Sequence, residues 1–254
     1  TPHMQRFKNQ TAIVTGGAHG IGLATARRLA SEGAAVAVAD MDFNAAEQAV
    51  QTIRATGGTA VAVQFDVTSR AQVETMLATV LTTYAQVDIL CNIAGIAHGE
   101  PFLEITDEKW HKTLDVNLTG VFLCSQVVAR HMAERKIAGR IVNMASTNGL
   151  VGEATLAHYN ASKFGVVGLT MTMAIDLAPY QIRVNSVCPG LIKTRLTQSA
   201  VNNPQWAADY LQKIPLNRFG EPEEVAAAVA YLASTDSGFI TGHQLVVDGG
   251  QLTF

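Results

Sequence analysis

Short runs rich in Val, Ile and Ala alternate with segments of helical period from one end of this chain to the other. Strands are expected near 11–15, 35–40, 60–66, 88–92, 140–145, 182–188 and 243–247. Such alternation is typical of parallel strands joined by right-handed crossovers. The runs 34–39 and 87–91 are almost wholly apolar, as expected where helices cover both faces of a sheet. The pattern predicts a doubly wound parallel sheet, the Rossmann fold of the α/β class.

Nothing in the 254 residues divides the chain into separate parts. It contains no Pro/Ser-rich linker, charge run, internal repeat or low-complexity tract. Because 48% of the residues are apolar, the chain can bury a full core, and we expect residues 4–254 to form one catalytic domain. Residues 1–3 before Met4 look like an expression remnant.

The composition narrows the class of partner. A formal net charge of −3 with scattered Lys and Arg gives no basic stripe, so nucleic acid is not expected as a partner. We find no signal peptide and no apolar run near the ~20 residues that span a bilayer, so no membrane partner is expected. Cys91, Cys124 and Cys188 lie singly in apolar segments without metal-ligand spacing, which favours reduced core thiols of a cytoplasmic protein and no metal site.

A glycine-rich turn follows the first expected strand. Gly16 closes the strand, and Gly20, Ile21 and Gly22 open the first expected helix. The free N–H groups and the dipole at a helix start suit a pyrophosphate, and glycines let the backbone approach it. The order Gly-x-x-x-Gly-x-Gly departs from the strict G-x-G-x-x-G pattern. A plain turn is the alternative, but its place between strand and helix favours a dinucleotide site.

An acid stands at the end of the second expected strand. Asp40 comes eighteen residues after Gly22, near the spacing at which an acid accepts hydrogen bonds from the adenosine ribose hydroxyls. A 2′-phosphate would meet like charge there, and Asp42 adds to it. His19 in the glycine turn is only a weak candidate for binding such a phosphate. We therefore expect NAD rather than NADP, the alternative being that Asp40 only caps the next helix.

Tyr159 and Lys163 stand one helical turn apart, and Ser146 lies thirteen residues upstream of Tyr159. Residues four apart share one helix face. An ammonium beside a phenol would stabilise the phenolate and lower a pKa that is ordinarily about 10. Such a phenol can take the proton from an alcohol while a hydride moves to a nicotinamide. The spacing predicts a hydride-transfer enzyme.

Taken in their order, these motifs identify the chain as a member of the short-chain dehydrogenase/reductase family in its compact form, over essentially its whole length. The resemblance implies a catalytic tetrad of Asn117, Ser146, Tyr159 and Lys163. In this tetrad Tyr159 would exchange the proton with the substrate, and Ser146 would hydrogen-bond the substrate oxygen. Lys163 would lower the pKa of the tyrosine and hold the nicotinamide ribose. Asn117 would hold a water molecule of the proton relay. Taken singly, each residue could instead be a cap, a turn residue, a solvated charge or a core aromatic.

The resemblance also implies further cofactor contacts. Asp66 and Val67 match the family's adenine-contacting pair, and 92–95 resembles its Asn-Asn-Ala-Gly segment, with Ile93 in place of the second Asn. Residues 189–194 resemble the Pro-Gly-x-x-x-Thr loop that packs on the nicotinamide. The expected cofactor-binding residues are Gly16, His19, Gly20, Ile21, Gly22, Asp40, Asp66, Val67, Asn92, Ala94, Gly95, Tyr159, Lys163, Pro189, Gly190, Ile192 and Thr194.

The substrate is less constrained. By analogy with the family, His98, Asn148, Glu153 and His158 are expected to face it, and their polarity suggests a sugar or polyol, although each could be an ordinary surface residue. The alternative is a 3-oxoacyl thioester reductase. Those enzymes usually prefer NADPH, which Asp40 argues against. A non-catalytic dinucleotide-binding scaffold is a further alternative, but it would be expected to carry a broken tetrad.

Residues 195–215 lack a strand pattern and are expected to form a mobile lid that brings Trp206 to the substrate. An ordinary helical surface insertion is the alternative. The helices near 117–135 and 159–178 carry apolar residues on more than one face, which together with the resemblance predicts a homotetramer. The apolar residues in question are Val121, Phe122, Leu123, Val127, Val128, Val166, Val167 and Leu169.

Overall fold

The computed structural model describes residues 5–253, so the expected expression remnant at residues 1–3 lies outside the described residues. They form a parallel sheet of seven strands in the order β3-β2-β1-β4-β5-β6-β7. The strands are β1 (Thr11–Thr15), β2 (Ala35–Asp40), β3 (Thr59–Gln64), β4 (Ile89–Asn92), β5 (Arg140–Met144), β6 (Arg183–Pro189) and β7 (Gln244–Val247). Each expected strand is present, and its ends differ by no more than two residues from those expected.

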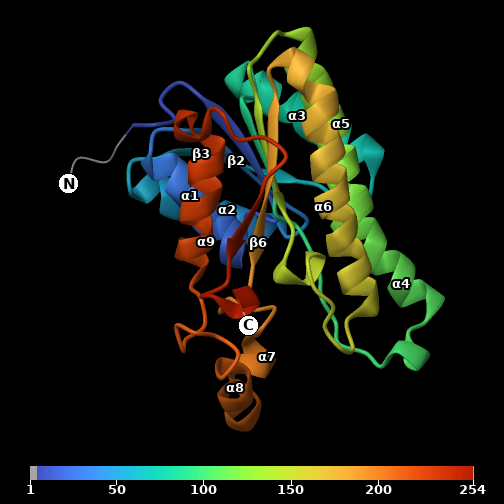
Figure 1. The fold of residues 1–254 in the computed structure, drawn as a ribbon. Coiled ribbons are helices and arrows are strands. Elements are labelled where there is room, and N and C mark those ends of the chain that lie inside the picture. Colours follow the sequence, from blue (N-terminus) through green and yellow to red (C-terminus); the bar gives the residue numbers. More distant parts are fainter. Residues whose placement is uncertain (1–4, 254) are drawn as a thin grey trace.

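Helices cover both faces of this sheet (Figure 1). The α-helices are α1 (Gly20–Ser31), α2 (Phe43–Ala55), α3 (Arg70–Tyr84), α4 (Asp107–Leu114), α5 (Gly120–Glu134), α6 (Ala157–Leu177), α7 (Gln198–Val201), α8 (Pro204–Leu211) and α9 (Pro222–Ala233). A π-helical segment, Asp115–Thr119, joins α4 to α5. One hydrophobic cluster lies between the sheet and α1, α2 and α9, and a second lies between the sheet and α3, α5 and α6.

The alternation of side chains along a strand explains the two layers. Ala12 and Val14 of β1 belong to the first cluster, whereas Ile13 between them belongs to the second. A strand buried on both faces must therefore be apolar at every position, as β1 is apart from its terminal threonines. The prediction of a doubly wound Rossmann fold is confirmed.

The order of the strands reverses at β1, which lies between β2 and β4. Ligands of open α/β sheets bind at the carboxyl ends of the strands beside such a reversal. A row of buried polar side chains runs beside this point. The Asn92 amide donates to Ser125 Oγ (2.9 Å) and to Asn143 Oδ1 (2.8 Å), and Asn143 Nδ2 donates to Thr170 Oγ1 (2.9 Å). These bonds connect β4 and β5 to α5 and α6.

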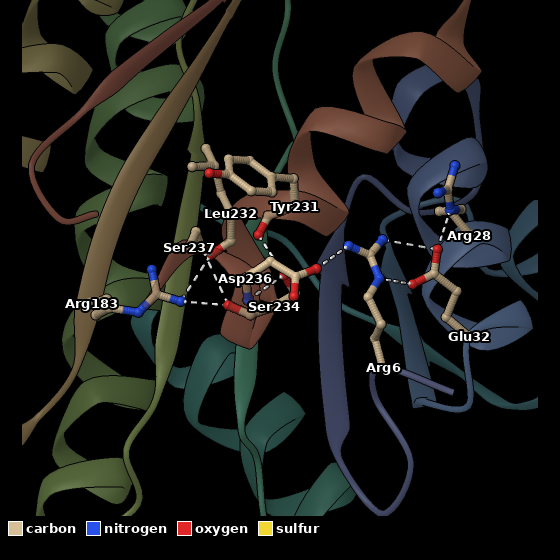
Figure 2. Close-up of polar contacts among 9 residues, drawn as sticks. All are labelled: Arg6, Arg28, Glu32, Arg183, Tyr231, Leu232, Ser234, Asp236 and Ser237. Atoms are coloured by element: carbon tan, nitrogen blue, oxygen red, sulfur yellow. Dashed lines mark hydrogen bonds and ion pairs between the residues drawn. The ribbon is translucent and has the colours of Figure 1, made fainter. Parts of the chain in front are cut away.

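Three arginines hold together segments that are distant in the sequence, as Figure 2 shows. Arg6 donates to both carboxylate oxygens of Glu32, at 2.5 and 3.0 Å, and to Asp236 at 3.1 Å. Arg28 also pairs with Glu32, whose side chain is buried. Arg183 donates to the carbonyl oxygens of Leu232 and Ser234, at 3.2 and 2.9 Å, and so holds the end of α9 against β6. Burial raises the pKa of Glu32, but the hydrogen bonds from the two arginines outweigh it and hold that pKa below its ordinary value.

We expect Glu32→Gln to lower the free energy of unfolding by about 1–3 kcal/mol at pH 7, because two guanidinium groups lose a buried partner. The pKa of Glu32 is lowered in the folded protein. Its contribution to the free energy of unfolding is therefore present above the ordinary glutamate pKa of 4.5, and it is lost as the pH falls through the lowered pKa. Urea unfolding at pH 7 and pH 3 measures both effects. The exposed Glu47→Gln is the control, and an equal loss in the two variants would contradict the assignment.

One expectation about apolar segments needs correction. Val121, Val128 and Val166 are buried within the chain, as are Leu123, Val127 and Val167, so they are core residues and not evidence for a second subunit. One helix, Ala157–Tyr180, has the length and composition that could cross a membrane, with a mean hydropathy of 1.2 over its most apolar window of 18 residues. A core helix passes the same test, and this helix carries buried Lys163 against the sheet.

Candidate active site

The turn between β1 and α1 has the backbone that the glycines predict. Gly16 and Gly20 lie in the left-handed region, with φ of 63° and 49°. A Cβ on Gly16 would lie 2.8 Å from Ala94 Cα, and one on Gly22 would lie 2.0 Å from the Gly16 carbonyl oxygen. The N-cap residue, His19, makes no side-chain cap hydrogen bond. The start of α1 therefore presents backbone N–H groups in a cradle that any side chain would fill, which fits a pyrophosphate.

The two acids after β2 have different roles. Asp40 Oδ2 accepts from Ala18 N at 3.1 Å and Oδ1 from Asp42 N at 3.0 Å, so the carboxylate is held beside the glycine turn. Asp42, and not Asp40, caps α2 by accepting from Ala45 N at 3.1 Å. His19 Nε2 lies 3.5 Å from Asp42 Oδ2. The capping alternative for Asp40 is wrong, and the imidazole faces a carboxylate of this chain.

The residues that follow β3 and β4 lie at the same edge of the sheet as the glycine turn. Asp66 Oδ1 accepts from the backbone N and the Oγ1 of Thr68, at 2.9 and 2.8 Å, and Val67 is buried. The backbone N of Ala94 donates to Thr15 Oγ1 at 3.2 Å. The Asn92 side chain is committed to Ser125 and Asn143, so a cofactor contact from this residue would have to come from its backbone.

The nicotinamide loop expected at 189–194 meets the glycine turn. A Cβ on Gly20 would lie 3.3 Å from Thr194 Cγ2, so two segments far apart in sequence touch at this point. Ile192 is buried and bridges Gly220 in a parallel pair. Gly190 follows Pro189 at the end of β6 and donates to the Val247 carbonyl oxygen at 3.0 Å. The expected cofactor-binding segments thus lie together at the carboxyl ends of the strands.

Tyr159 and Lys163 lie on α6, and Ser146 follows β5. Lys163 Nζ donates to the Met144 carbonyl oxygen at 2.8 Å and lies 5.5 Å from the centroid of the Tyr159 ring. Burial lowers the pKa of Lys163 to about 8, so the ammonium remains protonated at neutral pH. Ser146 Oγ accepts from Asn148 N at 3.1 Å, and the serine side chain acts on the Tyr159 hydroxyl by lowering its pKa.

The pKa of Tyr159 differs from the sequence expectation. Burial raises it above its ordinary value, and the hydrogen bond with Ser146 lowers it by less than burial raises it. The Lys163 ammonium donates to the Met144 carbonyl oxygen and lies 5.5 Å from the centroid of the tyrosine ring. In the protein alone, the phenol is therefore held in its neutral form.

Asn117 lies in the π-helical segment, fully buried. Its Oδ1 accepts from Ile96 N at 2.8 Å, while Nδ2 donates to the Ile96 carbonyl at 2.9 Å and to Ser162 Oγ at 3.1 Å. A Cβ on Gly95 would lie 3.3 Å from Asn117 Oδ1 and 3.7 Å from Lys163 Nζ, so Gly95 lies beside both. Asn117 is not the N-cap considered as an alternative. Single-turn π segments recur at functional sites, and no pattern in the sequence predicts this one.

The expected substrate residues divide into two groups. Asn148 and Glu153 are hydrogen-bonded to each other beside Ser146, whereas His98 is exposed. His158 is fully buried and its Nδ1 accepts from Tyr159 N at 2.9 Å, so it supports the start of α6 and does not have the exposure of a substrate contact. Trp206 stacks on Tyr210 with ring centroids 4.6 Å apart.

Sequence reasoning missed Tyr210 and Gln251. Tyr210 is buried, and its hydroxyl accepts from Gln251 Nε2 at 3.1 Å. It lies one helical turn after Trp206 on α8, inside the expected lid, and this spacing was the available signal. The lid segment contains α7 and α8, and its base is closed by Gly220, which donates to Leu191 O at 3.0 Å and accepts from Lys193 N at 2.9 Å. Whether the segment moves stays a prediction.

The glycine turn that fits a dinucleotide lies at the same edge of the sheet as Ser146, Tyr159 and the buried Lys163. This arrangement is typical of an oxidoreductase that acts on CH–OH groups and uses a nicotinamide dinucleotide. Comparison with known proteins agrees. Residues 16–251 match the profile of a family described as enoyl-(acyl carrier protein) reductase. The chain is 41% identical to a 3-oxoacyl-[acyl-carrier-protein] reductase of Synechocystis sp. over 99% of its length and all of the relative. The chain belongs to the short-chain dehydrogenase/reductase family.

Other relatives carry different names. The chain is 41% identical to a meso-2,3-butanediol dehydrogenase of Serratia marcescens, covering 96% of the chain and 95% of the relative. It is 38% identical to a 5-keto-D-gluconate 5-reductase of Escherichia coli, covering 94% of each. A crystal structure of a short-chain type dehydrogenase/reductase from Mycobacterium marinum superposes with a TM-score of 0.93 at 38% identity, covering 98% and 97% of the two chains. The relatives thus share a reaction class and differ in substrate.

Proposed function

We propose that this protein interconverts a secondary alcohol, best a polyol or sugar, and its ketone with NAD(H), through the tetrad of Asn117, Ser146, Tyr159 and Lys163. The observation that carries the proposal is the Tyr159–Lys163 pair on α6, whose lysine is held by the Met144 carbonyl two residues before Ser146. The polar Asn148 and Glu153 lie beside Ser146. A 3-oxoacyl thioester reductase remains the alternative, favoured by the name of the Synechocystis relative.

The bound nicotinamide would accept the hydride when the alcohol is oxidised. In that direction Ser146 Oγ holds the alcohol oxygen, and the Tyr159 oxygen takes its proton. Lys163 is fixed by the Met144 carbonyl, and its ammonium holds the nicotinamide ribose and stabilises the phenolate as it forms. Asn117 fixes Ile96 and, through water, connects the lysine to solvent, so that the proton leaves. In reduction the same groups return the proton to the ketone oxygen.

The first experiment is NAD⁺ and NADP⁺ reduction, followed in the ultraviolet, against polyols, sugars, simple secondary alcohols and 3-hydroxyacyl esters, with Tyr159→Phe beside the wild type. We expect turnover of a polyol or sugar with NAD⁺ that the variant loses. Preference for hydroxyacyl esters with NADP⁺ would move the conclusion to the alternative. Silence with every substrate would support a non-catalytic dinucleotide-binding scaffold.

We expect Asp40→Ser to raise the ratio of kcat/KM with NADP⁺ to kcat/KM with NAD⁺ by about 10–100-fold. The variant removes the negative charge that would repel a 2′-phosphate, and it also removes the carboxylate that accepts from the ribose hydroxyls of NAD⁺. Steady-state kinetics with both cofactors measures the ratio. Glu47→Gln on α2 removes an exposed carboxylate and is the control for net charge. A ratio that stays at the wild-type value would remove the cofactor argument.

We also propose that the chain assembles as a homotetramer through an exposed apolar stripe on α6. Phe164, Met171 and Ile175 lie along one face of this helix and are 47%, 46% and 75% exposed, and Phe122 of α5 is 40% exposed. Apolar side chains in such a row are typical of a subunit interface. We further infer that residues 4–254 act as one domain in the cytoplasm, since all three cysteines are buried free thiols.

Ile175→Glu is expected to dissociate the tetramer at micromolar concentration, because it places a charge in the apolar stripe. Light scattering coupled to size exclusion reports the mass. Thr79→Glu, which introduces the same charge on an exposed position of α3, should leave the mass unchanged. A wild-type protein with the mass of a monomer would overturn this part of the proposal.

A further inference from the structure

The start of α6 lacks the usual cap of a helix. Its N-cap residue is Leu156, whose side chain has no hydrogen-bond acceptor. Asn160 N donates to the Leu156 carbonyl oxygen at 2.7 Å, which is the first hydrogen bond of the helix. The carbonyl oxygen four residues before Tyr159 belongs to Thr155, and it accepts from Glu100 N at 2.7 Å instead. The backbone N–H of Tyr159 therefore needs an acceptor from outside the helix backbone.

His158 supplies that acceptor. Its Nδ1 accepts from Tyr159 N at 2.9 Å. Because a backbone N–H can only donate, Nδ1 carries no proton, and the proton of the neutral imidazole is on Nε2. The side chain is fully buried, and within residues 5–253 its Nε2 has no hydrogen-bond partner. The ring is held in one tautomer by its contact with the residue that carries the catalytic hydroxyl group.

The backbone before α6 is strained and fixed at Thr155. This residue has φ of 65°, a left-handed conformation that is rare for a β-branched side chain. Such strain persists only where the surrounding contacts hold it. Here the Thr155 carbonyl is bound by Glu100 N, and the Glu100 carboxylate pairs with Lys109 of α4. The Thr155 carbonyl is therefore not free to bind the Tyr159 N–H if His158 is replaced.

We propose that His158 is a positioning residue for the catalytic tyrosine: its unprotonated Nδ1 holds the backbone of Tyr159 and so places the hydroxyl group that exchanges the proton. This rests on the function proposed above. Lys163 lies one turn further along α6 and is held by the Met144 carbonyl, so its position does not depend on the contact. A second proton on the imidazole would set a donor on Nδ1 against the N–H donor, and the contact would be lost.

The contact is therefore sensitive to acid. The titratable groups that face the ring are His98, Glu100 and Lys109, of which Glu100 and Lys109 form an ion pair with each other. Burial has the largest effect and lowers the pKa of His158 below its ordinary value of 6.5. The acceptor is present above the lowered pKa and is lost as the pH falls through it.

The first test uses two variants whose side chains have the same shape. Asparagine can offer Oδ1 in the place of Nδ1, whereas leucine has the same branching without an acceptor. With NADH and 3-hydroxybutan-2-one, we expect His158→Leu to lower kcat by about 10–100-fold, as a small misplacement of a catalytic group does. His158→Asn should keep most of the wild-type kcat, and fluorescence titration should give all three proteins the same NADH affinity. Equal kcat in the two variants, or a parallel loss of NADH affinity in His158→Leu, would overturn the proposal.

The second test follows kcat of the same reduction as a function of pH. Tyr159 must carry its proton in this direction, so low pH alone favours its reacting form. We nevertheless expect the wild-type kcat to fall as the pH drops below the ordinary histidine value of 6.5. His158→Asn should show no such fall, because an amide does not titrate. The control is His111→Asn, an exposed position on α4, which should keep the wild-type profile. A fall that persists in His158→Asn would contradict the assignment.

A measurement without substrate separates this inference from the proposed function. In protein that carries ¹⁵N-labelled histidine, the chemical shifts of the ring nitrogens report the tautomer, and the spectrum of His158→Asn identifies the resonance of His158. We expect the proton on Nε2 at neutral pH. A proton on Nδ1 would overturn the inference whatever the activity. If His158 has the expected tautomer but the wild type reduces no ketone, the proposed function falls and the contact with Tyr159 stands.

Discussion

Tyr159→Phe is expected to lower kcat by about 10²–10⁴-fold with little change in NADH affinity, because the variant loses only the oxygen that exchanges the proton. The rest of the ring packs as before, and Lys163 keeps its bond to the Met144 carbonyl. Stopped-flow turnover and NADH fluorescence titration measure the two quantities separately.

Tyr84→Phe is the matched control. This tyrosine lies on α3, away from the carboxyl ends of the strands, and burial raises its pKa as it does that of Tyr159. Loss of one partly buried hydroxyl is therefore common to both variants, whereas Ser146 acts only on the hydroxyl of Tyr159. Turnover retained in Tyr159→Phe at the level of the control would remove Tyr159 from the mechanism.

Gly22→Ala is expected to weaken NADH binding by about 5–150-fold, the range that corresponds to about 1–3 kcal/mol of overpacking. The new Cβ would lie 2.0 Å from the Gly16 carbonyl oxygen and 3.1 Å from Gly17 Cα. These are backbone atoms, so the turn must change shape, and the N–H groups at the start of α1 lose their arrangement. Isothermal titration of the variant with NADH measures the affinity.

Gly57→Ala distinguishes a defect of the turn from a general loss of stability. Gly57 has φ of 85°, so alanine strains the backbone there, but a Cβ at this position meets nothing within 4 Å. It precedes β3 and lies at the amino ends of the strands, at the opposite edge from the glycine turn. We expect this control to lower the melting temperature and to bind NADH normally. Equal affinities in the two variants would show that the turn does not shape the cofactor site.

Local patterns were sufficient to predict the fold and the positions of the motifs. The apolar strands, the glycines between β1 and α1 and the four-residue spacing of Tyr159 and Lys163 are all set by residues near in sequence. Their effect on backbone geometry is direct, because a left-handed φ or a shared helix face needs no distant partner.

Features that depend on distant packing could not be predicted. The direction of the Lys163 ammonium depends on the Met144 carbonyl, nineteen residues away, and burial by distant segments raises the pKa of Tyr159 instead of lowering it. His158 is buried although a histidine beside the catalytic tyrosine is a natural substrate contact. The position of Tyr210 beside Gln251 depends on how residues 195–215 fold back onto the chain, and no periodic pattern in the sequence predicts that path.

The polar row from Ser125 to Thr170 also limits how this sequence can vary. Asn92 and Asn143 occupy paired positions on β4 and β5, and each uses its amide to satisfy the other or a helix hydroxyl. Replacing Asn92 alone by an apolar residue leaves the buried Asn143 Oδ1 without its donor, whereas changing both residues removes that donor and acceptor together. The two positions are therefore coupled, and the free energies lost in the single variants are not expected to add in the double variant.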